Sequence, residues 1–204
     1  MFTGIVQSQA KVLTIKTNNN LSRLTVGVEE KYISALDIGA SVAINGVCLT
    51  AVEFGQHDEN QAYICFDVID ETLRVTNLAH LTADMMVNLE RSLKAGDEIG
   101  GHMVSGHVHC QGELLEKKVS ATNCALTFSC DTAQVKYILE KGFIAINGVS
   151  LTVGQVGDAQ FNVHLIPETL SRTNIGALEV GQKVNIEFDQ QTITIVKTIE
   201  RLKL

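Results

Sequence analysis

Residues 43–50 read AINGVCLT and residues 145–152 read AINGVSLT, so one chain of 204 residues carries nearly the same octapeptide twice. The copies differ only where Cys48 corresponds to Ser150. Three further blocks recur in the same order: MFTGIV and MVSGHV start at residues 1 and 103, ETLRVTNL and ETLSRTNI at 71 and 168, and VNLE and VNIE at 87 and 184. The spacing is 102 residues early and 97 residues late, and a loss of five residues near the polar stretch 55–61 reconciles the two values. The sequence therefore predicts an internal duplication.

Each half has the pattern of an all-β unit. Runs such as CLTAVEF, YICFDVI and VSLTVGQV are rich in Val, Ile, Phe and Thr and are bounded by Gly, Asn or Asp. Asn45-Gly46 and Asn147-Gly148 predict hairpins, because a primed two-residue turn requires positive φ at both central positions. Halves of roughly 90–100 residues with many short strands indicate small closed barrels, which we place at residues 1–97 and 98–190.

Three segments have a helical pattern. The stretches EEKYISAL (29–36) and AQVKYILEK (133–141) hold matching positions in the two halves and are expected to be helical. The tail, residues 191–204, begins with strand-like alternation and then places Val196, Ile199 and Leu202 on one face of a short helix. Such a tail either closes its own barrel or contacts other subunits.

Composition narrows the classes of function. The net charge of −7 has the wrong sign for a nucleic-acid binder, and the longest apolar runs fall far short of the ~20 residues that a membrane helix needs. No secretory leader is visible. Five irregularly spaced cysteines without a CxxC pair favour free thiols, so we expect a cytoplasmic protein. A small molecule or another protein is the expected partner.

The repeated blocks, with GGHMVSGH, KGFIAINGVSLTV, HLIPETL and VNIEFD, closely resemble the riboflavin synthase family of bacteria and yeast over essentially the whole chain. The resemblance implies two six-stranded Greek-key barrels and a C-terminal helix around which homotrimers form. It implies conversion of two molecules of 6,7-dimethyl-8-ribityllumazine into riboflavin and 5-amino-6-(D-ribitylamino)uracil, at a site between the first barrel of one subunit and the second barrel of its neighbour. Association with lumazine synthase is possible in this family.

That reaction explains a doubled turn. One substrate molecule donates a four-carbon unit and another accepts it, so two similar pockets must present the same compound face to face. Loss of a proton from the C7 methyl group gives an anion delocalised over the ring, so no external cofactor is expected. The protein contributes mainly proximity and orientation, with some acid–base assistance.

The differences between the halves suggest the catalytic residues. His107 stands where the first half has Ile5, so it either moves protons or is a surface histidine. Cys48 and Ser150 either attack or polarise a ring carbon, or are small residues that fit beside a ring. Ser41 and Asp189 match family positions associated with activity, and are further catalytic candidates.

Substrate contacts are implied by the resemblance. Thr50 and Thr152 have hydroxyl groups that suit a uracil-like edge, although threonine is also a common strand residue. Glu71 and Glu168 are candidates for the ribityl hydroxyls, and Lys141 matches a lysine that reaches the ligand across the subunit boundary. The full expected set is Gly4, Ile5, Val6, Cys48, Leu49, Thr50, Asp67, Val68, Ile69, Asp70, Glu71, Thr72, Gly106, His107, Val108, Lys141, Ser150, Leu151, Thr152, His164, Leu165, Ile166, Pro167, Glu168 and Thr169.

Two possible roles are not assigned: acid–base chemistry at residue 147 and metal binding. Asn147 departs from the aspartate that many relatives carry, which removes a charge, so we assign it no acid–base function. His102, His107, His109 and Cys110 fit no recognised zinc spacing, so we expect no metal.

Two other functions use similar scaffolds. Lumazine and yellow fluorescent proteins hold a chromophore without turnover, and one copy of the site would then be free to decay; here both turns and both ETL blocks persist. A flavin reductase barrel would need a Rossmann partner, and no GxGxxG-bearing βαβ unit is present. The sequence favours the enzyme.

Overall fold

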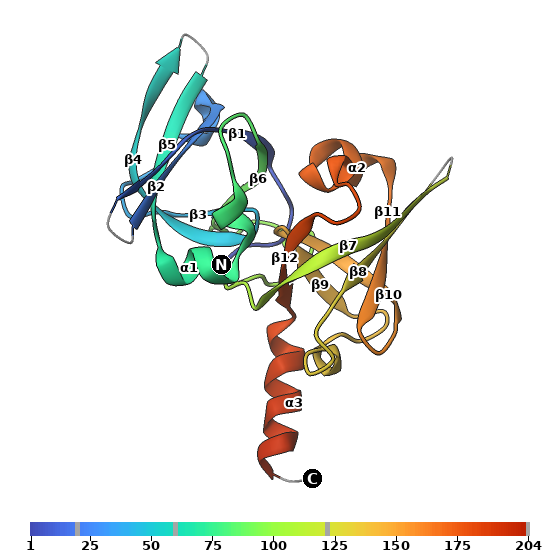
Figure 1. Ribbon diagram of the computed structural model, residues 1–204. Coiled ribbons are helices and arrows are strands. Elements are labelled where there is room, and N and C mark those ends of the chain that lie inside the picture. Colours follow the sequence, from blue (N-terminus) through green and yellow to red (C-terminus); the bar gives the residue numbers. More distant parts are fainter. Residues whose placement is uncertain (19–20, 59–60, 121–122, 203–204) are drawn as a thin grey trace.

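The computed structural model describes residues 1–18, 21–58, 61–120 and 123–202, and shows two closed barrels side by side, with a helix projecting from the second (Figure 1). The first barrel has strands β1 (Ser8–Asn18), β2 (Leu21–Glu29), β3 (Ser41–Ile44), β4 (Val47–Asp58), β5 (Gln61–Ile69) and β6 (Met86–Arg91). The second has β7 (Cys110–Val119), β8 (Cys124–Ser129), β9 (Phe143–Ile146), β10 (Val149–Val156), β11 (Gln160–Leu165) and β12 (Lys183–Phe188). Helix α3 (Gln190–Leu202) follows.

Both barrels have the same topology. The first closes in the order β1-β2-β5-β4-β3-β6, and the second, β10-β11-β8-β7-β12-β9, is the same cyclic order read in the other direction. In the first barrel the consecutive strands β3, β4 and β5 lie side by side, and β6 returns to pair with β3. In the second barrel β9, β10 and β11 lie side by side, and β12 returns to pair with β9. This is the Greek-key arrangement. Every pairing between named strands is antiparallel. The predicted fold class is confirmed.

The asparagine–glycine turns are as predicted. Asn45 and Gly46 have φ of 47° and 76°, and Asn147 and Gly148 have φ of 46° and 79°. These values define the primed turn that joins β3 to β4 and β9 to β10. Beyond the turn, alternate residues of β4 point inward and outward, so Val47 and Leu49 are buried in the first core while Cys48 and Thr50 point outward.

The expected helices at 29–36 and 133–141 are wrong in extent. Only the 3₁₀ turns η1 (Glu30–Tyr32) and η3 (Val135–Tyr137) form there. A helix of eight or nine residues is marginal by itself, and each segment instead bridges two strands that are not neighbours in the barrel. Tyr32 and Ile138 enter the cores, and the positive φ of Ala35 and Lys141 breaks any continuing helix.

The tail is helical from its first turn, so the expected strand-like start is wrong. Asp189 caps the helix, because its Oδ2 accepts from Thr192 N–H at 2.9 Å and from Thr192 Oγ1 at 2.8 Å. Ile193 is buried in the second core, whereas Ile195, Ile199 and Leu202 are exposed. No helix among the described ranges is long and apolar enough to cross a membrane.

The two barrels meet at their matching turns. A Cβ built on Gly46 would lie 2.5 Å from the backbone nitrogen of Gly148, so only glycine fits there. Around this contact six buried or partly buried asparagines, three from each half, form a shared hydrogen-bond network: Asn45, Asn77, Asn88, Asn147, Asn174 and Asn185. Because buried amides need partners, this network fixes how the barrels are oriented.

Short elements connect the late strands of each barrel. They are α1 (Asp70–Val75) and η2 (Asn77–His80) in the first half, and α2 (Pro167–Arg172) and η4 (Asn174–Ala177) in the second. Helix α1 begins directly after β5, and helix α2 begins two residues after the last residue of β11.

Candidate functional site

Each half places its glycine-containing segment over the other barrel. Gly106 O accepts from Cys48 N–H at 2.8 Å, and Gly4 O accepts from Ser150 N–H at 2.8 Å. Val6 belongs to the core cluster of the second barrel, and Val108 packs against the core of the first. The two candidate sites are therefore composite, because each joins one barrel face to a segment from the other half of the chain.

The first site lies on the outer face of β3, β4 and β5. Ser41 pairs with Thr50, and Ala43 pairs with Cys48, two residues apart along the sheet and therefore on the same face. A Cβ on Gly106 would lie 2.5 Å from Cys48 Cβ, so the segment that carries His107 lies directly on Cys48. His107 itself is exposed. The structure thus brings together Ser41, Cys48, Thr50 and the Gly106–His107 segment.

The second site repeats this arrangement with different chemistry. Phe143 pairs with Thr152, and Ala145 pairs with Ser150. Ser150 Oγ lies 2.7 Å from Nδ1 of His102, whose ring stacks on Phe143 with centroids 5.0 Å apart. Burial lowers the pKa of His102, and the charge of Asp189 opposes that shift. At neutral pH the imidazole is therefore neutral, and in the tautomer that carries its proton on Nε2, Nδ1 can accept the hydrogen bond from Ser150 Oγ.

The two sites also differ near the end of β5 in the first barrel and of β11 in the second. Asp67 accepts from Arg23 Nε at 2.8 Å and from Arg23 Nη2 at 2.9 Å, and this pair holds the pKa of Asp67 below its usual value. In the second barrel His164 corresponds to Asp67, and its Nδ1 lies 3.0 Å from Asn123 Nδ2. An arginine–aspartate ion pair therefore borders the first site, and a histidine–asparagine contact borders the second.

The other predicted contacts fall into two groups. Leu49, Val68, Leu151 and Leu165 fill the barrel interiors, so only their backbones are available to a ligand. Gly4, Ile5, Ile69, Asp70, Glu71, Thr72, Ile166, Pro167, Glu168 and Thr169 lie outside the cores, on the N-terminal segment or at α1 and α2. Glu71 is paired with Arg74, and Glu168 with Arg172, on the exposed helix surfaces. Their role toward a ribityl chain remains a prediction.

Lys141 has a left-handed backbone conformation, as does the equivalent residue of the first half. Its φ is 65°, in the left-handed region, and the corresponding residue of the first half is Gly39 with φ 91°. The two amides make equivalent hydrogen bonds, Lys141 N–H to Val153 O and Gly39 N–H to Ala51 O. A lysine at a position that suits glycine costs conformational energy, which supports a function for its side chain.

The histidines of the 102–110 segment do not converge. His102 faces Ser150, while His109 lies beside Phe188 with ring centroids 5.3 Å apart. Among the residues that the structure describes, no group of three or more His, Cys, Asp or Glu side chains is placed to hold a metal ion.

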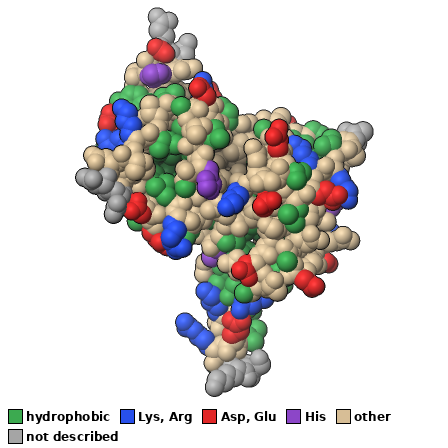
Figure 2. Space-filling view, in the orientation of Figure 1, with side chains coloured by type: hydrophobic (Ala, Val, Ile, Leu, Met, Phe, Trp, Pro, Cys, Tyr) green, Lys and Arg blue, Asp and Glu red, His purple; other side chains and the backbone are tan. Residues whose placement is uncertain are grey.

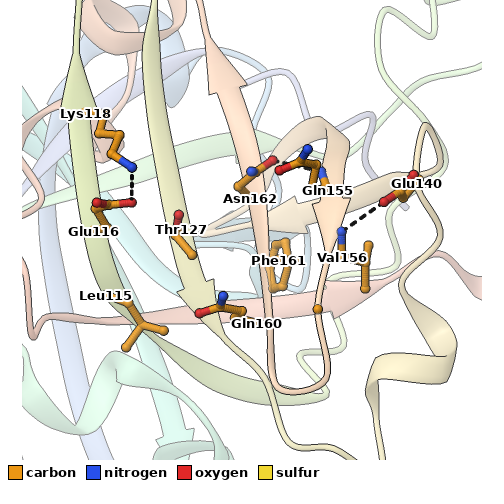
Figure 3. A pocket seen from close by; sticks show the side chains of 11 residues that line it. Leu115, Glu116, Lys118, Thr127, Glu140, Gln155, Val156, Gln160, Phe161 and Asn162 are labelled. Carbon is orange, nitrogen blue, oxygen red and sulfur yellow. Dashed lines mark hydrogen bonds and ion pairs between the residues drawn. The ribbon is translucent and has the colours of Figure 1, made fainter.

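One hollow on the surface of the second barrel lies away from the candidate site. A hollow of about 700 Å³ opens on the second barrel, between β7, β8, β10 and β11 (Figure 3). Bulges in the β7–β8 and β10–β11 ladders open it, and its walls are already paired, as in Lys118 with Glu116 and Gln155 N–H with Asn162. None of the predicted site residues lines it.

Sequence reasoning missed four residues beside the sites. His102 stands just before the repeated MVSGHV block, so comparison of the halves does not reach it. Arg23 lies outside every repeated block. Glu90 and Glu187 end the repeated VNLE and VNIE blocks, and each accepts hydrogen bonds from a glycine-containing segment. Their recurrence was a usable signal.

The comparisons with known proteins agree with one another. The model of the Lumazine binding domain matches residues 3–92 and again residues 105–189. Riboflavin synthase of Escherichia coli strain K12 is 46% identical over 203 residues, which cover 99% of this chain and 93% of that protein. Riboflavin synthase of Chlamydia muridarum is 40% identical over 203 residues, which cover 100% of this chain and 97% of that protein.

Solved structures show the same architecture. LumP complexed with riboflavin has a TM-score of 0.81 and 26% identity, and covers 93% of this chain and 100% of its own. LumP complexed with 6,7-dimethyl-8-(1'-D-ribityl) lumazine also has a TM-score of 0.81, at 23% identity, which speaks for the fold alone. With two matched domains and relatives of this similarity over its whole length, the chain belongs to the riboflavin synthase family and carries two copies of the lumazine-binding domain.

Proposed function

We propose that the chain acts as a riboflavin synthase. Two molecules of 6,7-dimethyl-8-ribityllumazine would yield riboflavin and 5-amino-6-(D-ribitylamino)uracil by transfer of a four-carbon unit. The observation that carries this proposal is the pair of composite sites, each built from an NGV[C/S]LT hairpin and a glycine segment from the other half. Two like sites suit a reaction that consumes the same compound twice.

The two sites would play different chemical parts. At the second barrel, neutral His102 would take the proton of Ser150 as the serine oxygen adds to C7 of the accepting lumazine. At the first barrel, His107 would remove a proton from the C7 methyl group of the donating lumazine, with Cys48 and Ser41 against its ring. Asp189 would act through its charge on His102. No step in this scheme requires an added cofactor.

Ligand recognition would use the polar edges of both faces. Thr50 and Thr152 would meet the uracil-like edges, and the residues of α1 and α2 would meet the ribityl chains. Arg23 and Asp67 would add a charged contact at the first site, and Lys141 would reach a ligand held by a neighbouring subunit.

We further propose a homotrimer built around α3. Ile195, Ile199 and Leu202 form an exposed apolar stripe at helical spacing, and the helix is held to its own barrel by Ile193 and by the Lys136–Glu200 ion pair, 2.6 Å long. The stripe supports the expectation that this helix meets other subunits. Truncation after Gln191 should leave monomers by sedimentation, and a surviving trimer would contradict this assignment.

In that assembly the first barrel of one subunit would face the second barrel of its neighbour. The boundaries 1–97, 98–190 and 191–204 would separate the two lumazine-binding units and the trimerisation segment. The five cysteines are free thiols, which supports a cytoplasmic location, and a lumazine synthase shell is a further partner to test.

Binding without turnover is the second candidate, because LumP has this fold and is described with bound riboflavin. Purified protein mixed with the lumazine decides between them. A synthase forms riboflavin and the pyrimidinedione in equal amounts without added cofactor. Unchanged lumazine after long incubation, in the presence of tight binding, would establish the binding-only function.

A further inference from the structure

Glu90 and Glu187 are buried carboxyl groups that the proposed chemistry does not use. Their exposed fractions are 4% and 5%, and neither forms an ion pair with a cation among the described residues. Glu90 is the penultimate residue of β6 in the first barrel, and Glu187 is the penultimate residue of β12 in the second. A buried carboxylate without a cation is costly, so its partners deserve an explanation.

Both carboxyl groups make the same three hydrogen bonds. Glu90 Oε1 accepts from Thr3 N at 2.7 Å and Thr3 Oγ1 at 2.8 Å, and Oε2 accepts from Gly4 N at 3.1 Å. Glu187 Oε1 accepts from Ser105 N and Ser105 Oγ, both at 2.7 Å, and Oε2 accepts from Gly106 N at 2.9 Å. Burial raises the pKa of both carboxyl groups, and these donors oppose that shift by stabilising the ionised form.

The held segments belong to the opposite sites. Gly106, fixed by Glu187, lies on Cys48 of the first barrel and accepts from its amide. Gly4, fixed by Glu90, lies on Ser150 of the second barrel, where its own Cβ would be 2.6 Å from Ser150 Cβ. Thr3 O also accepts from His102 N–H at 3.2 Å, so Glu90 supports the His102–Ser150 pair through Thr3.

We propose that Glu90 and Glu187 are crosswise positioning residues: each is anchored in one barrel and sets the geometry of the site on the other barrel. Glu187 orients the Gly106–His107 segment against Cys48, and Glu90 orients the Thr3–Gly4 segment against Ser150 and His102. The two sites are thereby kept in a fixed relation within one chain. This inference rests on the proposed function only for its consequence in turnover, because the positioning itself is a statement about structure.

A thiol-labelling experiment tests the crosswise relation without any assay of turnover. Cys48 is half-buried beneath Gly106, while Cys65, Cys124 and Cys130 are buried and burial raises the pKa of Cys110 to about 12. Alkylation by iodoacetamide, resolved by mass spectrometry, therefore reports on Cys48. The Gly106 segment covers Cys48 and is held by hydrogen bonds to the Glu187 carboxylate. Glu187→Gln removes the charged acceptor and should loosen this cover, so it should raise the labelling rate of Cys48 by about tenfold. Glu90→Gln should leave it unchanged.

The reciprocal experiment moves the reporter to the other barrel. Exchanging the pair, with Cys48→Ser and Ser150→Cys together, places the thiol at position 150. In that background Glu90→Gln should accelerate labelling about tenfold and Glu187→Gln should not. The exposed strand residue Glu113 supplies the matched control, because Glu113→Gln should change neither rate.

The pattern of rates decides the outcome. Equal acceleration by both variants would mean general loosening, and no acceleration by either would mean that the cover does not depend on the carboxylates; each result overturns the proposal. If a glutamine variant does not fold, Ser105→Ala removes one hydrogen bond to Glu187, and Ser105→Thr keeps it, since Thr3 is the natural twin. Faster labelling of Cys48 in the alanine variant alone supports the proposal, and equal labelling in both contradicts it.

Turnover then separates positioning from the proposed reaction. In a working synthase, Glu187→Gln should lower kcat by about tenfold or more with little change in KM, because the binding surfaces persist while His107 loses its alignment. Crosswise labelling together with no turnover even in the unmodified protein would refute the synthase assignment and leave the positioning role in place.

Discussion

Exchanging Lys141 and its twin Gly39 should move stability in opposite directions. A residue with a side chain in the left-handed region costs about 1–2 kcal/mol relative to the right-handed one, and glycine loses about 0.5–1 kcal/mol more in chain entropy on folding. The difference predicts that Lys141→Gly stabilises the fold by about 1 kcal/mol, although it removes a charged side chain.

The first barrel supplies the matched control. A Cβ added at Gly39 meets nothing within 4 Å, so the change there is conformational and not steric. Gly39→Lys should therefore destabilise by about 1 kcal/mol, and the two variants should shift the midpoint of thermal unfolding by about 2–4 °C in opposite senses. Differential scanning calorimetry measures both.

Turnover completes the test of Lys141. If its ammonium group contacts the ligand, Lys141→Gly should lower kcat/KM by about tenfold or more while the protein becomes more stable. A less stable Lys141→Gly variant would refute the backbone argument. Undiminished kcat/KM would refute the contact, and would leave the strained lysine without a function.

Three more predictions follow from burial and close contact. His102→Gln should slow turnover, and in the unmodified enzyme the loss of kcat with acid should fall below pH 6.5, because burial keeps His102 neutral there; a loss centred above 6.5 would contradict that role. Burial raises the pKa of Glu90 above 4.5, so the folded state binds this proton more tightly than the unfolded state does. The contribution of Glu90 to the free energy of unfolding therefore falls as the pH rises from 4.5 to the raised pKa. Glu90→Gln should remove this slope in denaturation measured across pH, and an unchanged slope would refute the assignment. Gly46→Ala should cost about 2–5 kcal/mol because its Cβ would meet the Gly148 backbone. Gly181 also has a positive φ, but a Cβ there meets nothing within 4 Å, so Gly181→Ala should cost only about 1–2 kcal/mol. Similar costs would show that the turns do not press together.

The fold was predictable because the same sequence pattern occurs in both halves of the chain. The positive φ of Asn45 and Gly46, and of their twins, follows from residue type alone, and alternation in β4 separates core from surface. Residues 29–36 and 133–141 were wrongly expected to form helices. Each stretch connects two strands that are not neighbours and buries side chains in a barrel core, which periodicity alone does not reveal. Figure 2 shows apolar side chains gathered over the first barrel among charges of both signs, a surface that composition alone does not map.

The site was partly predictable for a related reason. Differences between twins pointed to His107, Cys48 and Ser150, since the scaffold tolerates other residues at those positions. The sequence did not reveal that the segments containing Gly4 and Gly106 each pack on the other barrel. Gly106 contacts Cys48 only when both barrels have folded and packed together. Pairwise chemistry such as that of Ser150 with His102 depends on this docking and not on any local pattern.

The central claim is that each polypeptide offers two working lumazine sites. Equilibrium titration of the intact protein with a lumazine analogue that lacks the C7 methyl group, and so cannot form the reactive anion, tests it most directly. The account predicts two bound molecules per chain, with one lost in a Thr50→Trp variant and the other in a Thr152→Trp variant. Saturation at one molecule per chain, abolished by only one of these variants, would contradict it.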